Sequence, residues 1–265
     1  MENGRGQRSC AFCNRVGSLT REHLWPEWLK AIFPKLGPPT HFFGLVGDDD
    51  SWVTEKRPAF SRRAKIVCAE CNNGWMSRLE MAAAPLMTPM LTGERRVMLN
   101  LDEQAIVAFW VVKTAMTMQL SHPTRRIDGI PVSHYESVYR EQRAPNACQV
   151  WIGACSHDDR PPNVPLAMVG RCRIAPLSRF RPIDIAPDQP VRRAYVATMS
   201  MGNLAMQVFG HQYVDSHVQL RYPNLAGSAL VQIWPFRLEK AEWPGSAALD
   251  YPTFDALTRA FEDFI

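Results

Sequence analysis

The stretch CAECNNGW, residues 68–75, repeats a cysteine spacing that first occurs in CAFCNRVGSLTREHLWPEW, residues 10–28. Each C-x-x-C pair places two thiols on one tight turn, and a structural zinc takes four such ligands at tetrahedral corners. The two pairs therefore predict one structural zinc site, with the ligands Cys10, Cys13, Cys68 and Cys71. The 54 residues between the pairs exceed the ~15–20 of the compact motif, so we expect an insertion between the two knuckles.

A zinc ion with four thiolate ligands has no open position at which it could activate water. Any catalytic hypothesis must therefore use other residues. The alternative is that the zinc only stabilises a small module of the treble-clef or ribbon type, without catalysis.

The chain also contains a second set of candidate functional residues, two of them in the insertion and one directly after the second cysteine pair. Glu22 and His23 are adjacent in TREHLWP, and Asn72 directly follows the last cysteine. Carboxylate and amide oxygens suit a hard cation such as Mg²⁺, and a neutral imidazole can take a proton from attacking water. On an extended strand adjacent side chains point to opposite faces, so only a bend brings both Glu22 and His23 toward one ion. Asn72 has the alternative role of capping the helix that we expect to follow it.

The order of the first cysteine pair, EHLWP and CAECN resembles the zinc-braced form of the HNH nucleases over roughly residues 8–85. This resemblance implies a ββα-metal module of the treble-clef type that hydrolyses DNA phosphodiester bonds. His23 would be the general base, and Glu22 and Asn72 would hold one catalytic Mg²⁺ or Mn²⁺. The four cysteines would hold the structural Zn²⁺.

The chain departs from this family at two positions. Glu22 stands where the family more often has Asp, and no Asn lies between Asn14 and Asn72 to orient the base. Thr40, His41 or a backbone carbonyl is the candidate replacement for that middle Asn. The departure favours an alternative function, a zinc-containing nucleic-acid-binding or scaffold protein with a degenerate HNH site.

Positive charge is concentrated in the part of the chain that contains the cysteine pairs. Residues 1–100 have 14 Lys and Arg against 10 Asp and Glu, whereas residues 101–265 have 16 of each. A basic bias in one module favours a polyanionic partner, although such a margin is also common on solvated surfaces. We predict DNA as the partner, with Arg62, Arg63 and Lys65 as candidate phosphate contacts or, equally, as a solvated strand.

The sequence predicts an α+β protein with a boundary near residue 95. Residues 1–95 would form the zinc-braced, HNH-like nuclease module, and residues 96–265 an α+β domain of unknown role. In the second part we expect a buried helix at about 102–120, antiparallel strands at about 146–235 and a C-terminal helix at about 252–263. This region could select substrate, form a homo-oligomer or bind a protein partner; it could also be an unrelated enzyme.

The N-terminal ten residues contain no apolar segment typical of a secretory signal. The most apolar stretch, residues 104–120, is about 17 residues long and includes Lys113, which fits a buried helix better than a membrane span. We therefore predict a cytoplasmic protein that does not associate with a membrane. In a reducing compartment paired C-x-x-C spacings indicate metal ligands rather than disulfides.

Overall fold

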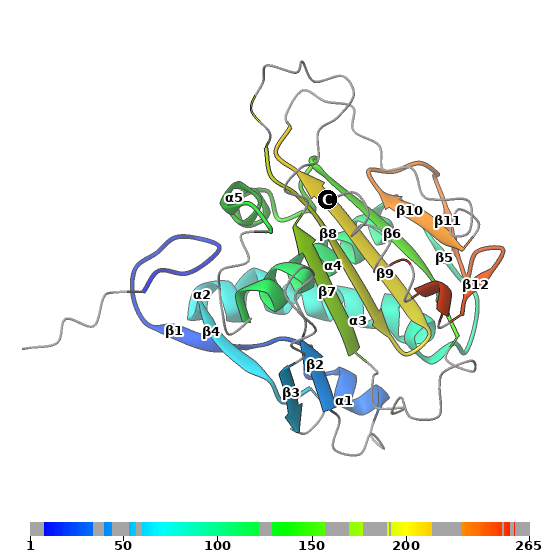
Figure 1. Ribbon diagram of the computed structural model, residues 1–265, viewed down its shortest axis with the longest axis horizontal. Helices are drawn as coiled ribbons and strands as arrows, with labels where there is room; N and C mark the ends of the chain where they lie inside the picture. Colours follow the sequence, from blue (N-terminus) through cyan, green and yellow to red (C-terminus); the bar gives the residue numbers. More distant parts are fainter. Residues whose placement is uncertain are drawn as a thin grey trace, which may run out of the picture.

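The computed structural model is of the α+β class, as predicted, with helices packed against antiparallel sheets (Figure 1). The residues that the structure describes are 8–33, 40–43, 53–56, 60–121, 129–156, 170–176, 190, 192–213, 229–250, 252–254 and 257. The largest sheet has six strands and lies in the second part of the chain, as the short β-rich runs of the sequence predict.

The central sheet has the strand order β10-β6-β9-β8-β7, and its sixth strand pairs with β6. Neighbours along the path are antiparallel, whereas β12 runs parallel to β6. The strands are β6 (Cys148–Cys155), β7 (Gly170–Pro176), β8 (Ala194–Met201), β9 (Leu204–His211), β10 (Leu230–Trp234) and β12 (Ala248–Leu249). A turn at Gly202 and Asn203 joins β8 to β9.

Both faces of the sheet are covered, and alternate residues serve different cores because strand side chains alternate between faces. Val150 and Ile152 of β6 belong to the large hydrophobic core, while Trp151 between them belongs to a smaller cluster. Figure 1 shows the long helix α4 (Leu101–Ser121) behind the sheet. Phe254 belongs to the smaller cluster and so packs against the opposite face. This double coverage explains why every residue of β6, β8 and β9 is buried.

Helix α4 confirms the predicted buried helix, and a pair of hydrogen bonds between Asn100 and Glu103 caps its start. The side chain of Asn100 accepts a hydrogen bond from the backbone N–H of Glu103, and the Glu103 carboxylate accepts one from Asn100 N–H. This reciprocal capping box satisfies two donors at the start of the helix. The helix then stays apolar through Val107–Ala115 except for Lys113 and Thr114, and all of these residues are buried.

The N-terminal part of the chain is built on an antiparallel pair, β1 (Leu19–His23) and β4 (Arg63–Cys68). The chain leaves β4 through one helical turn, α2 (Ala69–Cys71), and a widened turn, η1 (Asn72–Met76), that is kinked at Gly74. The remaining elements of this part are α1 (Leu29–Ile32), β2 (Thr40–Phe43), β3 (Val53–Lys56) and α3 (Ser77–Thr92). The two cysteine pairs therefore lie at one end of this antiparallel pair of strands, which we call the hairpin although α1, β2 and β3 lie between its strands, and which leads directly into a helix.

The end of α3 is joined to the β8–β9 turn by close backbone contacts. The backbone N–H of Asn203 donates to the Leu91 carbonyl across 3.0 Å. Gly202 has φ +51°, and a Cβ atom there would overlap the same carbonyl. A larger residue at Gly202 would therefore strain the turn and separate the two elements.

One hydrophobic core extends from the cysteines to Trp243 and includes residues on both sides of residue 95. The remaining described elements of this part are the pair β5 (Val97–Leu99) and β11 (Ala241–Trp243) and the helix α5 (Val132–Glu141). The division of the chain at residue 95 stays a prediction. The C-terminal helix expected at 252–263 lies mostly outside the described residues, of which only 252–254 and 257 belong to that range.

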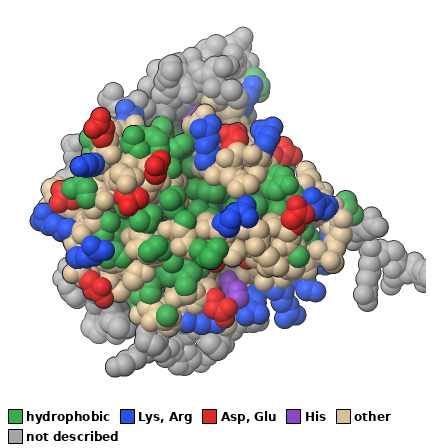
Figure 2. Space-filling view, turned by 180° about the vertical axis from the view of Figure 1, so that it is seen from behind, with side chains coloured by type: hydrophobic (Ala, Val, Ile, Leu, Met, Phe, Trp, Pro, Cys, Tyr) green, Lys and Arg blue, Asp and Glu red, His purple; other side chains and the backbone are tan. Residues whose placement is uncertain are grey.

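Over the described residues, no helix combines the length and the apolar character that a membrane span requires. Seen from behind, the molecule has hydrophobic side chains gathered over the middle of its surface, with charged side chains around them (Figure 2). Exposed apolar residues occur on α3 and α4, namely Met81 and Leu101. Oligomerisation or binding of a protein partner through the C-terminal region stays a prediction.

Candidate metal centre and adjoining polar site

The four cysteines of the two pairs converge on one point. Their sulfur atoms all lie within 4.8 Å of one another, and the Sγ atoms of Cys13 and Cys68 are 3.7 Å apart. A tetrahedral zinc site with Zn–S bonds of about 2.3 Å has sulfur–sulfur edges of about 3.8 Å. The donor type, number and spacing thus fit a structural metal such as zinc, as the sequence predicts.

The chain forms this cluster through two local turns held side by side. The backbone N–H of Asn14 donates to the Cys10 carbonyl, closing the first knuckle, and the N–H of Ala11 donates to the Ile66 carbonyl on β4. Burial raises the pKa of the Cys13 and Cys71 thiols, so a thiolate at either position requires a neighbouring cation. Within the described part of the chain, no other group of three or more His, Cys, Asp or Glu side chains is close enough to hold one ion.

Glu22 is buried on β1 and forms an ion pair with Lys113 in the middle of α4. The Lys113 Nζ lies 3.3 Å from the Glu22 Oε1 and 2.8 Å from the Glu80 Oε1 on α3. The Lys113 side chain is 0% exposed and that of Glu22 is 6% exposed. One ammonium group therefore joins three elements, β1, α3 and α4, and one of its two partners is the predicted catalytic residue Glu22.

Burial acts on the pKa values of both Lys113 and Glu22, but the neighbouring charges change the outcome only for Lys113. Burial lowers the pKa of Lys113, but the carboxylates of Glu80 and Glu22 together outweigh burial and raise it. Burial and the nearby Glu80 raise the pKa of Glu22, and Lys113 only partly opposes them. Two carboxylates share one ammonium, so Lys113 stays charged while the more buried carboxylate gains protons more readily than usual.

His23 is partly exposed on the other face of β1 and contacts β4. The Arg63 Nε donates a hydrogen bond to the His23 Nε2 across 2.7 Å, as the antiparallel pairing of these two residues allows. Burial and the positive charge of Arg63 lower the pKa of His23. The ring is therefore neutral, with its proton on Nδ1 and its Nε2 lone pair directed at the guanidinium.

Asn72 lies against the same strand, two residues before Glu22. Its Nδ2 donates to the Thr20 Oγ1 across 3.0 Å, and the Thr20 Oγ1 donates to the Val67 carbonyl. Asn72 does not have the expected capping role, because one helical turn, α2, already precedes it and its own backbone is helical. With its nitrogen used by Thr20, the oxygen Oδ1 is the Asn72 atom suited to a cation.

The structure thus brings Asn72 to β1 but sends Glu22 and His23 to opposite faces of that strand. The strand has an irregular register between Thr20 and Arg21, whereas Glu22 and His23 follow regular pairing. The bend that would turn both side chains toward one ion is therefore absent from the described strand. The side chains of Thr40 and His41, the candidate replacements for the middle Asn, lie outside what the structure describes.

The three basic residues proposed as phosphate contacts differ in their surroundings. Arg63 and Lys65 are exposed, and their alternate position along β4 places them on one side of the hairpin. Arg62 is half-buried and its Nη2 donates to the Ser121 carbonyl at the end of α4. Arg62 and Arg63 each have a contact within the protein, with the Ser121 carbonyl and with His23, and both Arg63 and Lys65 are exposed.

The chain matches no protein-family model, no curated protein and no solved structure. The geometry of the chain is therefore the basis for any assignment of function.

Lys113 and Glu80 are the residues of this region that the sequence motifs did not indicate. The available signal was a single lysine inside a long apolar helix, since a buried ammonium requires a carboxylate partner. The identity of that partner depends on the tertiary fold, because Glu22 is 91 residues and Glu80 is 33 residues from Lys113.

A second polar cluster is formed by His134, Cys148 and Tyr195. These residue types occur in nucleophilic sites, but the thiol of this cluster is not activated. The Cys148 Sγ lies 3.6 Å from the His134 Nδ1 and 3.4 Å from the Tyr195 hydroxyl. Burial raises the pKa of Cys148 to about 12 and lowers that of His134 to about 4. A fully buried, protonated thiol is a poor nucleophile, so this cluster is part of the core.

Proposed function

We propose that this protein is a metal-dependent endonuclease of the HNH type that hydrolyses DNA phosphodiester bonds. The observation that carries the proposal is the convergence of four cysteines around a β-hairpin whose first strand ends in Glu22-His23 and whose following helix begins with Asn72. A tetrathiolate site stabilises such a module and leaves the hydrolytic step to the residues beside it.

His23 is the proposed general base. Its ring is neutral and partly exposed, as proton abstraction from water requires. The Arg63 guanidinium must leave Nε2 before this nitrogen can accept a proton. A DNA phosphate is a stronger partner for a guanidinium than an imidazole, so binding of the substrate favours that release.

Glu22 and Asn72 are the proposed ligands of one Mg²⁺ or Mn²⁺. This ion, when bound, neutralises the scissile phosphate and stabilises the leaving oxygen. The Lys113 ammonium contacts Oε1 of Glu22, so the proposed cation would share this carboxylate with Lys113. Arg63 and Lys65 then serve as phosphate contacts on the exposed side of the hairpin.

The test is nicking of supercoiled plasmid by the purified, zinc-loaded chain in Mg²⁺ or Mn²⁺. We expect nicking that is lost in His23→Ala and Glu22→Gln and retained in Glu94→Gln, a matched change at an exposed site outside this region. Circular dichroism and zinc content show whether each variant keeps its fold. Nicking that survives His23→Ala would contradict the proposal.

A second candidate function is a non-catalytic nucleic-acid-binding or scaffold protein with a degenerate site. The observation that favours it is the engagement of both key side chains by internal cations, Glu22 by Lys113 and His23 by Arg63. Absence of nicking in every divalent ion, together with DNA binding that is unchanged in His23→Ala and weakened in Lys65→Gln, would favour this candidate.

A further inference from the structure

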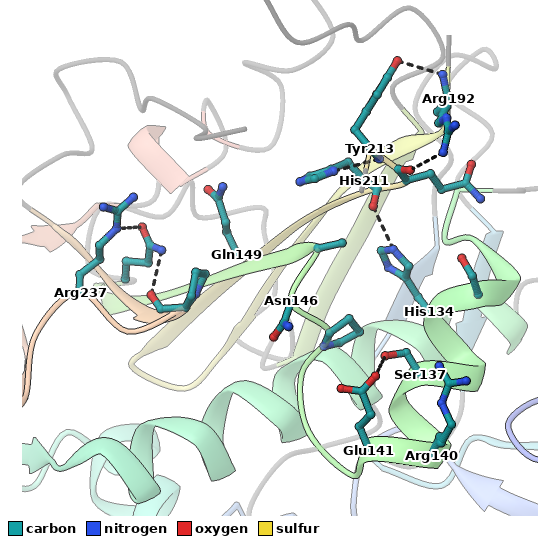
Figure 3. Close-up of a pocket in the computed structure, with 16 residues that line it drawn as sticks. His134, Ser137, Arg140, Glu141, Asn146, Gln149, Arg192, His211, Tyr213 and Arg237 are labelled. Carbon is teal, nitrogen blue, oxygen red and sulfur yellow. Dashed lines mark hydrogen bonds between the residues drawn. The ribbon is translucent and has the colours of Figure 1, made fainter. Parts of the chain in front are cut away.

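A cavity of about 910 Å³ lies away from the cysteine cluster, between α5 and the ends of β6, β9 and β10. Figure 3 shows labelled side chains from these elements directed around a shared space, with Arg192, Arg237 and Arg140 on three different sides of it. A volume of this size is at the upper end of those of small-molecule sites, which are about 300–1,000 Å³. The cavity is therefore large enough to hold a ligand of nucleotide size.

The described side chains of the cavity wall carry a net positive charge. Among them, the charged lining residues are the three arginines and Glu141. The Glu141 carboxylate accepts hydrogen bonds from the Ser137 hydroxyl and from Arg143, a residue outside the lining, across 2.9 and 3.0 Å. Since Arg143 offsets this negative charge, the described lining residues do not balance the positive charge of the three arginines.

Within the described part of the chain, the guanidinium groups of Arg192 and Arg237 donate hydrogen bonds to neutral groups. Arg192 donates to the Gln212 carbonyl across 3.3 Å, and Arg237 donates to the Gln232 side-chain oxygen across 3.4 Å. No carboxylate in the described part of the chain forms an ion pair with Arg140, Arg192 or Arg237. Guanidinium groups of this kind recognise phosphate and carboxylate groups through paired hydrogen bonds.

The wall nearest α5 is held in place by buried side chains. The His134 Nε2 donates to the His211 carbonyl across 3.1 Å, and the His211 Nδ1 accepts the backbone N–H of Tyr213 across 3.2 Å. Both imidazoles are 5% exposed. A wall fixed in this way requires little reordering when a ligand binds, which favours affinity.

We propose that this cavity binds a phosphorylated small molecule of nucleotide size with at least two negative charges. Arg192 and Arg237 hold its phosphates from different sides of the cavity, and the exposed lining residues Asn146 and Ser133 offer hydrogen bonds to its uncharged part. The three arginines exceed what a single carboxylate needs, so a diphosphate suits the site better. The proposal is independent of the nuclease activity.

The test is calorimetric titration of the full, zinc-loaded chain with pyrophosphate and with ADP, in buffer without divalent ions. We expect both to bind, and the double variant Arg192→Gln/Arg237→Gln to weaken binding by about tenfold or more, since each lost charge-assisted hydrogen bond has a cost of that order. Arg96→Gln is the matched control, because this exposed arginine pairs with Glu242 and does not line the cavity.

Failure of both probes to bind at millimolar concentration would overturn the proposal, as would binding that the double variant leaves unchanged. A ten-nucleotide DNA strand provides a third arm. If only this strand binds, and the double variant weakens it, the cavity is a nucleic-acid contact and not a small-molecule site. Because no divalent ion is present and no cleavage is measured, none of these results depends on the outcome of the nicking experiment.

Discussion

The Nε of Arg63 donates a hydrogen bond to the Nε2 of His23 across 2.7 Å and so connects β4 to β1 at the end of the hairpin. The contact places a fixed positive charge against the proposed general base. An imidazolium beside a guanidinium is disfavoured by like-charge repulsion, and burial of the ring acts in the same direction.

Arg63→Gln is therefore expected to raise the pKa of His23, because it removes the nearest positive charge. Titration of the imidazole carbon-bound protons by NMR measures this pKa without any activity assay. The control is Arg21→Gln, which removes the same charge from an exposed position on β1. A His23 pKa that moves no further in Arg63→Gln than in Arg21→Gln would show that the contact is not maintained in solution.

Lys113→Met should be strongly destabilising, since it leaves the buried carboxylate of Glu22 without its counter-charge. Removal of one partner of a buried ion pair typically costs about 3–5 kcal/mol, whereas an exposed pair contributes about 0–1 kcal/mol. Urea unfolding measures the difference. The matched control is Arg15→Met, which breaks the exposed ion pair between Arg15 and Glu70.

The double variant Lys113→Met/Glu22→Gln should recover part of the stability that Lys113→Met loses. An uncharged amide is less costly to bury than an unpaired carboxylate. Equal destabilisation by Lys113→Met and Arg15→Met would contradict a buried network between β1, α3 and α4.

The cysteine cluster could be predicted from the sequence because each pair forms its own local turn. Cys10 and Cys13 share one knuckle and Cys68 and Cys71 another, so only the meeting of two turns depends on the rest of the fold. Helix α4 was predictable for a similar local reason, as its apolar residues and acidic first turn are consecutive in the sequence.

The contacts around Glu22 and His23 could not be predicted in the same way. The two residues are adjacent in the sequence, but on the strand their side chains point to opposite faces. Glu22 contacts the Lys113 ammonium and His23 contacts the Arg63 guanidinium. Lys113 comes from a helix that begins 79 residues after Glu22, and Arg63 from the opposite strand of the hairpin. Such pairings are set by tertiary packing, and no local pattern indicates them. The arginines of the cavity likewise come from α5, the segment between β10 and β11, and the approach to β8.

Cys68→Ser should lose the bound metal and lower the melting temperature of the protein. The site needs four soft ligands, and a hydroxyl is a poor substitute for a thiolate on zinc. Elemental analysis should give about one zinc per chain before the change and little after it. Cys155→Ser is the control, because this buried cysteine lies outside the cluster and its loss should leave the zinc content unchanged.

The stability of the protein should fall as the pH decreases from 6.5 to about 4, in part because of His134. Burial lowers the pKa of this ring to about 4, while the unfolded chain takes up the proton near 6.5. The folded state therefore binds fewer protons in this range, so the stabilisation that exists above pH 6.5 is lost as the pH falls. The difference in pKa corresponds to about 3 kcal/mol.

His134→Gln isolates this contribution from that of the carboxylates. Glutamine keeps a donor for the His211 carbonyl but does not titrate, so the variant lacks this part of the pH dependence. Urea unfolding at pH 7, 6, 5 and 4 should show the variant less stable at pH 7, with the difference from the natural chain narrowing toward pH 4. A difference that stays constant over this range would mean that the His134 ring can be protonated within the folded protein, contrary to its buried position between Tyr195 and the His211 carbonyl.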